Sequence, residues 1–166
     1  MSVVIRNLQR TVTLNIKQLY QNTLLLKKLC GYEEFELGVI LVRNNSIRKL
    51  NKIYRECDEV TDVLAFPYHE IKPNEHISYL HLKDEERMLG DIVLALPYIK
   101  AESQKHKEDL DSVLLTMIAH GLCHLIGFDH ETKEQWEEMY KKELDILNKF
   151  NNTAGYKCSP LLSVGH

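Results

Sequence analysis

The chain has 166 residues, of which 44% are hydrophobic and 27% are charged, and these values are typical of a folded globular protein with one domain. Its formal net charge of −3 excludes the strongly basic composition of many nucleic-acid-binding proteins. No apolar run approaches the roughly 20 residues that span a bilayer, so the sequence predicts no membrane segment.

The first 32 residues differ in charge from the rest of the chain. They contain no acidic side chain and five basic ones, whereas the remaining residues carry 16 basic and 24 acidic side chains. A basic, acid-free start is typical of organelle import signals, which predicts a mitochondrial location for a eukaryotic source, with a cytoplasmic location as the alternative. The same residues equally favour ordinary elements of the fold, namely a strand in SVVIRN and a helix over 13–29 that ends before Gly31.

The middle of the chain is predicted to contain three strands and two helices. Strands are predicted over 35–42, 61–67 and 89–96, and helices over 44–55 and 97–107. Asn44 or Asn45 is expected to cap the helix over 44–55, and Pro97 to open the helix that follows the last strand. The polar residues 68–88 are predicted to form a surface loop.

A helix over 110–126, capped by Asp109, is apolar on nearly every side. Its polar residues form one stripe at intervals of four: Ser112, Thr116, His120 and His124. Such a helix is buried, and its polar stripe should face a cavity or a ligand, because unpaired buried polar groups are costly. Thr132 and Gln135 form a capping box for a last helix over 133–149.

These elements predict an α+β fold, because strands and helices do not alternate regularly. We expect a single domain over residues 1–150, in which a four-stranded mixed sheet packs against helices and the helix over 110–126 is central and buried. Residues 151–166 are expected to form a flexible C-terminal tail. The four cysteines, Cys30, Cys57, Cys123 and Cys158, form no C-x-x-C pair, which favours free thiols in a reducing compartment.

The segment HGLCHLIGFDH, residues 120–130, carries three histidines. His120 and His124 lie one turn apart on one helix face, and Gly127 can end the helix so that the chain returns with His130. Three imidazoles leave a fourth position for water, as in catalytic zinc sites, although nickel and iron also suit them. Packing or polar-network histidines are the alternative. Cys123 is interpreted as a packing residue, with a fourth ligand as the alternative.

The same spacing matches the extended zincin pattern H-E-x-x-H-x-x-G-x-x-H at all positions but one. Gly121 stands where that pattern has its glutamate. Because the glutamate is the general base of peptide hydrolysis, its absence argues against a protease.

Three blocks of the sequence resemble the YbeY family of endoribonucleases. HGLCHLIGFDH resembles the family's H-G-x-x-H-L-x-G-[YF]-D-H signature, and NKIYRECDEVTDVLAFP (51–67) is similar to its N-x-x-Y-R-x-x-D-x-x-T-D-V-L-S-F-P segment. LGDIVLAL (89–96) resembles its L-G-D-I strand. The blocks follow the family's order, and the similarity extends over residues 2–150. The chain departs from the pattern at Cys57, at Val60 in place of proline, and at Ala65 in place of serine.

The resemblance implies a zincin-like fold and a zinc-dependent endoribonuclease that cuts single-stranded RNA. It implies a role in 3′-end maturation of small-subunit ribosomal RNA and in ribosome quality control. The implied partners are ribosomal RNA precursors and small-subunit proteins, with neither DNA nor membrane. By position, His120, His124 and His130 would be the zinc ligands.

The resemblance also implies that Arg55 is a catalytic residue. The planar guanidinium group, with its several N–H donors, is suited to stabilising the negative charge of a phosphorane. The residue pattern alone favours a surface cation at a helix end. Asp62 and Asp91 either orient a ligand histidine or belong to turns and strand edges, and the sequence leaves both interpretations open.

Two other functions remain open at this point. The first is a metallohydrolase with another substrate, such as a zincin-like peptidase. The second is a non-catalytic ribosome-assembly module with a structural zinc, which the lack of an obvious basic patch favours.

Overall fold

Four strands form one mixed sheet in the computed structural model, which describes residues 2–164. They are β1 (Val3–Asn7), β2 (Glu36–Val42), β3 (Val63–Pro67) and β4 (Met88–Ala95), in the order β1-β2-β4-β3. β1, β2 and β4 run parallel, and β3 pairs antiparallel with β4. β3 is therefore an edge strand with a single neighbour. The predicted α+β fold with a four-stranded mixed sheet is confirmed.

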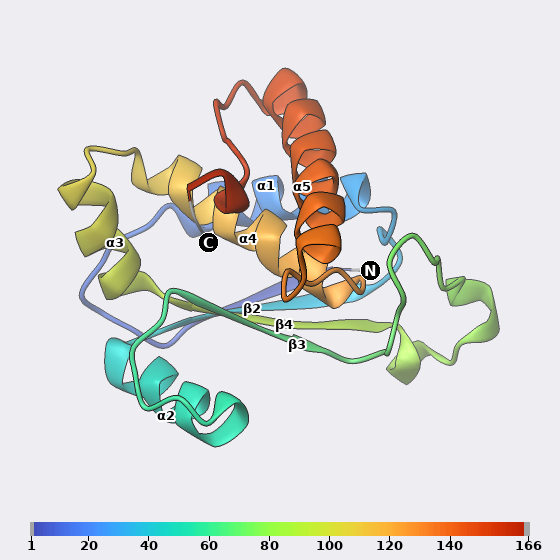
Figure 1. Ribbon diagram of the computed structural model, residues 1–166, viewed down its shortest axis with the longest axis horizontal. Helices are drawn as coiled ribbons and strands as arrows, with labels where there is room; N and C mark the ends of the chain where they lie inside the picture. Colours follow the sequence, from blue (N-terminus) through green and yellow to red (C-terminus); the bar gives the residue numbers. More distant parts are fainter. Residues whose placement is uncertain (1, 165–166) are drawn as a thin grey trace.

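The helices cover the two faces of the sheet unequally. Helices α1 (Ile16–Leu29), α4 (Leu110–Leu125) and α5 (Lys133–Ala154) lie on one face, whereas α2 (Asn44–Arg55) lies on the other (Figure 1). Helix α3 (Leu96–Lys105) directly follows β4. Short 3-10 turns interrupt the long loop before β4, and a further one lies at Leu161–Val164. None of the described helices is long and apolar enough to span a membrane.

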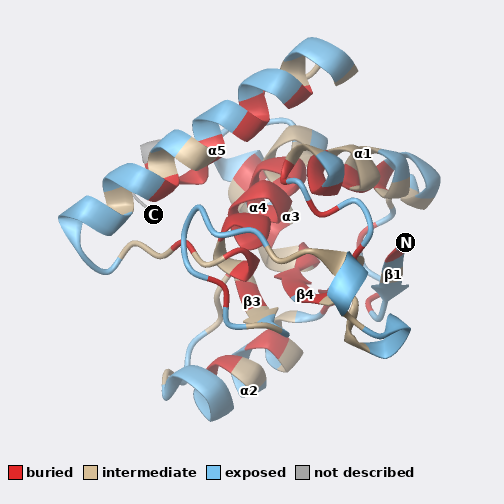
Figure 2. Cartoon of the chain, turned by 90° about the vertical axis from the view of Figure 1, so that its right-hand side faces the viewer, coloured by how far each residue is buried: buried red, intermediate tan, exposed pale blue. Residues whose placement is uncertain are grey.

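Helix α4 occupies the centre of the molecule, between the sheet and the outer helices (Figure 2). Eleven of its residues are buried, including every position from Leu114 to Cys123. They share one core with inward-facing side chains of β2 and β4 such as Leu37, Val39 and Ile92. A second, smaller cluster joins Ile47 of α2 to the opposite face of the sheet. The prediction of a central buried helix is confirmed.

Helix ends differ from the sequence prediction where a side chain has another partner. Neither Asn44 nor Asn45 caps α2, because the N-cap position is Arg43, which makes no side-chain capping bond. The Asn44 side chain instead accepts a hydrogen bond from the backbone N–H of Tyr98 at 3.0 Å. The first N–H groups of a helix have no partner within it, so Asn44 ties the start of α3 to α2.

The acid-free N-terminal segment is part of the fold. β1 pairs with β2 along its whole length, and Leu26 of α1 is fully buried. Lys27 is also fully buried, and its ammonium group donates to the backbone carbonyl of Phe35. Burial lowers the pKa of Lys27. The strand and helix predicted for this segment are confirmed.

The C-terminal segment continues the fold past the expected end of the domain. Residue 150 lies inside α5, which runs to Ala154. Asn151 then bonds the backbone of Cys158 in both directions, donating to its carbonyl and accepting from its N–H, each at 2.9 Å. Leu161 and Leu162 are buried at 6% and 1% exposure. The described part of residues 151–166 therefore packs on the core.

All four cysteines are free thiols, as predicted. Cys30 and Cys123 are buried, and burial raises the pKa of Cys30 to about 12 and that of Cys123 well above its ordinary value. Cys57 is partly exposed in the loop after α2. A thiol reacts as its thiolate, so access and pKa both protect the two buried groups.

We therefore expect iodoacetamide at pH 8 to alkylate Cys57 of the folded protein well before Cys30 or Cys123. Peptide mass mapping over a time course measures the three rates. In urea all three thiols should react at similar rates. Equal rates for Cys123 and Cys57 in the folded state would show that Cys123 does not face the core.

Candidate metal centre

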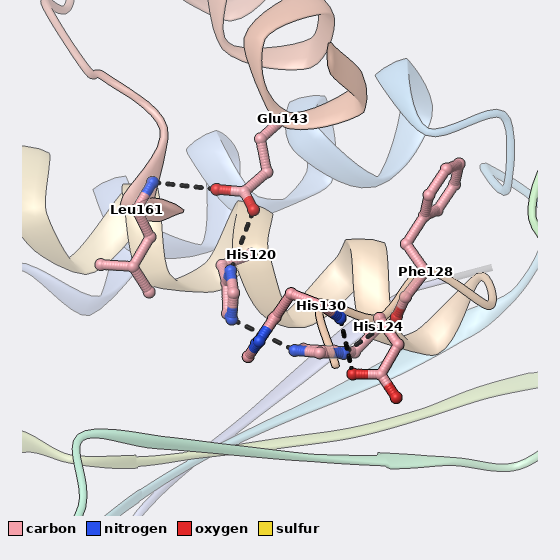
Figure 3. Close-up of polar contacts among 7 residues, drawn as sticks. His120, His124, Phe128, His130, Glu143 and Leu161 are labelled. Atoms are coloured by element: carbon pink, nitrogen blue, oxygen red, sulfur yellow. Dashed lines mark hydrogen bonds and ion pairs between the residues drawn. The ribbon is translucent and has the colours of Figure 1, made fainter. Parts of the chain in front are cut away.

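Helix α4 positions two of the three histidines by its own geometry. Asp109 caps its first turn by accepting from the N–H of Ser112, which confirms the predicted start. His120 and His124 then lie one turn apart on the same face, with the Nε2 atoms of the two rings 3.2 Å apart. His120 is only 3% exposed, whereas His124 is half-buried. Both rings are directed toward the sheet beside β3 (Figure 3).

The third histidine arrives by a sharp reversal after α4. Gly127 has a φ of +105°, and a Cβ there would lie 2.1 Å from the carbonyl oxygen of Ile71. Only glycine fits this turn without displacing backbone. Asp129 then accepts from the N–H of His130 at 2.8 Å and fixes the returning chain. The candidate ligand atoms of His120, His124 and His130 all lie within 4.8 Å of one another.

The hydrogen bonds of the two helix histidines set their tautomers. Nδ1 of His120 lies 3.0 Å from a carboxylate oxygen of Glu143, and Nδ1 of His124 lies 2.9 Å from the carbonyl oxygen of Phe128. Both partners are acceptors, so each neutral ring carries its proton on Nδ1 and a lone pair on Nε2. Two lone pairs 3.2 Å apart cannot bond each other. They can share a cation.

The donor set fits a metal ion. Zinc–nitrogen bonds of about 2.0–2.1 Å in a tetrahedron place two ligand nitrogens about 3.3 Å apart, close to the observed 3.2 Å. Burial, together with the neighbouring His120 and His130, lowers the pKa of His124 to about 4. The ring is therefore neutral at physiological pH, as metal binding requires. The three histidines form a group able to bind a metal ion.

Glu143 is the supporting residue that the sequence analysis missed. It lies on α5, is fully buried, and accepts from His120 through one carboxylate oxygen. The other oxygen accepts from the backbone N–H of Leu161 at 2.9 Å, so α4, α5 and the C-terminal segment meet at this carboxylate (Figure 3). The signal was an acidic residue on the apolar face of the last helix, between Met139 and Leu147.

The two aspartates proposed for this supporting role lie elsewhere or have other partners. Asp91 is exposed, and its carboxylate lies across Gly38 of the neighbouring strand. Asp62 is buried at the rim of the cleft, where one carboxylate oxygen accepts from the N–H of Val63 at 2.7 Å. Glu143 orients His120, and the backbone carbonyl of Phe128 orients His124.

Arg55 and the histidines, 65 or more positions apart in the sequence, line the same open cleft of about 240 Å³. The other walls come from the end of α2, the segment 61–65 and Gly121. Helix α2 ends at Arg55 because Glu56 takes a left-handed conformation. Asn51 then fastens the following loop by donating to the carbonyl of Glu59 at 3.0 Å. The fold thus places an arginine at the mouth of the candidate metal site.

Two further positions of the histidine segment are explained by packing. Cys123 is fully buried in the main core and is not among the clustered ligand atoms, which agrees with its interpretation as a packing residue. A Cβ at Gly121 would meet the side chain of Ile92 at 2.9 Å. The close packing of α4 on β4 at this point therefore disfavours the glutamate that a zincin peptidase carries there.

The fold and the site together define an α+β protein with a three-histidine candidate metal centre at the edge of its sheet. The family model for the endoribonuclease YbeY matches residues 4–151. The chain belongs to the endoribonuclease YbeY family.

Individual relatives support this assignment. A human endoribonuclease YbeY is 38% identical over 161 residues, which cover 97% of this chain and 95% of that protein. An endoribonuclease YbeY of Clostridioides difficile is 38% identical over 124 residues, covering 74% and 77% of the two chains. The solution structure of TM1509 from Thermotoga maritima has the same fold, with a TM-score of 0.52 and 23% identity over 95% of this chain and 99% of that one.

Substitution of Glu143 by glutamine tests its support of His120. The amide can accept from only one of the two N–H donors, so His120 or Leu161 loses its partner. We expect zinc affinity to fall roughly 10- to 100-fold, as for other residues that orient a metal-binding histidine. Competition with a chromophoric chelator measures it, and Glu138→Gln on the exposed face of α5 is the matched control. An affinity within twofold of the wild type would contradict this role.

Removal of the C-terminal segment tests its contribution to the site. A chain ended after Ala154 loses the N–H of Leu161 and the burial of two leucines, each worth about 1.5–3 kcal/mol. We expect both a lower melting temperature and weaker zinc binding. A chain ended after Leu162 retains these contacts and is the control. Equal metal affinity in the two truncated proteins would show that Glu143 is held without Leu161.

Proposed function

We propose that the protein is a zinc-dependent endoribonuclease specific for single-stranded RNA. The observation that carries this proposal is a cleft lined by Arg55 and by three histidines, two of which have lone pairs directed toward each other. Family membership supplies the ribonuclease class, and the donor set supports the choice of zinc.

The residues have distinct roles in this proposal. His120, His124 and His130 hold the metal, and zinc held by three imidazoles supplies a Lewis acid and a bound water of lowered pKa. Glu143 and the carbonyl of Phe128 keep the two helix imidazoles in their ligating tautomers. Arg55 binds the scissile phosphate through its planar fork of donors and stabilises the charge that develops on it.

We further propose that the substrate is a precursor of small-subunit ribosomal RNA, whose 3′ end the protein matures. In this proposal the protein also acts in ribosome quality control, and its partners are proteins of the small subunit. The family resemblance motivates this proposal.

For a eukaryotic source, the acid-free N-terminal residues support a mitochondrial location. Since they form β1 and α1, we propose that they are retained after import; the location and size of a C-terminal fluorescent fusion test this.

The variants Arg55→Ala and His124→Ala separate chemistry from metal binding. We expect Arg55→Ala to keep about one zinc per chain and to lose RNA cleavage by roughly 100- to 1,000-fold, because a charge-stabilising donor is lost. His124→Ala should lose both the metal and the activity. Elemental mass spectrometry and cleavage of a purified single-stranded RNA measure the two effects. Arg10→Ala, an exposed arginine that is not among the cleft residues, is the control.

Cells that lack the protein test the finer assignment with the same variants. Unprocessed 3′ ends of small-subunit ribosomal RNA should accumulate and should be removed by the wild type, whereas Arg55→Ala should not restore processing. Unchanged cleavage by both Arg55→Ala and His124→Ala in vitro would disprove the proposed mechanism. A stably folded, metal-free His120→Ala protein would exclude a purely structural zinc.

A further inference from the structure

Two aromatic side chains of the described residues are more than half exposed, and both lie beside the metal cleft. Tyr54 is 63% exposed and Tyr68 is 56% exposed, whereas every other Phe, Trp or Tyr of residues 2–164 is buried or half-buried. Each exposed ring is supported by another ring. Tyr54 meets Phe66 edge-on at 5.2 Å between centroids, and Tyr68 meets His69 at 4.9 Å.

These rings follow the edge strand that borders the site. Tyr54 immediately precedes Arg55, and its partner Phe66 lies on β3, two residues before Tyr68. Tyr68 lines a second hollow of about 360 Å³, which shares His124 with the metal cleft. We call Tyr54, Phe66 and Tyr68 the aromatic row. Tyr54 and Phe66 are in ring contact on the α2 side of β3, and Tyr68 follows the end of that strand in the hollow that contains His124.

Helix α2 adds positive charge at the start of the aromatic row. Between residues 43 and 55 the chain has five basic side chains and no acidic one: Arg43, Arg48, Lys49, Lys52 and Arg55. Arg48 is paired with Asp58, and Arg55 lines the metal cleft. Asp58 also lies near Lys52 and offsets part of this charge. Basic side chains on the helix that ends at the cleft complement the phosphates of a nucleic acid.

We propose that the aromatic row binds unstacked bases of single-stranded RNA by stacking, while Lys52 and Arg55 hold the neighbouring phosphates. This proposal rests on the ribonuclease function proposed above and adds the residues that select a single strand. Aromatic faces stack on any base, so recognition of this kind tolerates sequence. In a duplex the bases are already paired and stacked, and the row has no free base to bind.

Alanine substitution of the two exposed tyrosines tests the proposal. Tyr54→Ala and Tyr68→Ala should each raise the Kd for a labelled 2′-O-methyl single-stranded oligonucleotide at least fivefold, and raise the KM for cleavage of the unmodified RNA more than they lower kcat. Tyr54→Phe and Tyr68→Phe keep the stacking face and should restore wild-type binding. Ile53→Ala removes an equally exposed apolar side chain next to Tyr54 and should change neither value.

Abasic nucleotides then locate the stacked bases. An oligonucleotide that lacks the base bound by Tyr54 should bind the wild type and Tyr54→Ala equally, because the same contact is missing in both complexes. A duplex of the same sequence should bind all variants alike and weakly. If the Kd values of the wild type and the alanine variants for the single strand lay within twofold of one another, the proposed role of the aromatic row would be disproved. The proposed ribonuclease function would not be affected by that result. A metal-loaded wild type that neither binds nor cuts RNA would overturn the proposed function itself.

Discussion

The positions of two imidazole protons determine the character of this site. The Nδ1–H of His120 donates to a carboxylate and that of His124 donates to a backbone carbonyl, so the two Nε2 lone pairs face each other at 3.2 Å. The rings are packed by α4 and cannot turn away without losing these bonds. Two facing lone pairs repel each other, and a cation between them removes the repulsion. The arrangement of the two rings is therefore suited to binding a metal ion.

Burial of Glu143 links the metal centre to the rest of the fold. A carboxyl group buried away from water is costly unless its oxygens are paired, and here each oxygen has an N–H donor. One donor comes from α4 and the other from Leu161, which lies beyond the residues that the family model matches. The packing of Leu161 and Leu162 on the core therefore supports the orientation of His120, a candidate metal ligand about forty positions earlier in the chain.

The sequence predicted the elements that depend on local pattern. The 3.6-residue spacing of apolar positions located α2 and α4 within a residue, and the capping signals at Asp109 and Thr132 were correct. The expected cap at Asn44 was wrong because its side chain bonds Tyr98, a residue 54 positions away. Glu143 was missed for the same reason, since its donors lie on other elements. Local pattern reports the helix on which a polar side chain lies, but it does not report the distant partner.

The charge of the chain illustrates the same limit. A net charge of −3 gave no sign of a nucleic-acid surface, because the acidic residues of the C-terminal half mask the basic helix α2 in the sum. Folding separates them in space and brings the basic helix to the cleft through Arg55. Phosphate groups respond to the local electrostatic field, so the positions of the charged side chains matter more than the net charge of the chain.

The site combines two requirements that oppose each other. Metal ligands must be held rigidly, which favours a buried helix, whereas a polymeric substrate must enter from solvent. Helix α4 meets the first requirement, and the contact between Gly121 and Ile92 brings it close enough to the sheet for its histidines to reach the edge. The edge strand β3 and the end of α2 meet the second, since they border a cleft that is open to solvent. A larger residue at position 121 would press on the side chain of Ile92, so the glycine that stands in place of the zincin glutamate permits this close packing of α4 on β4.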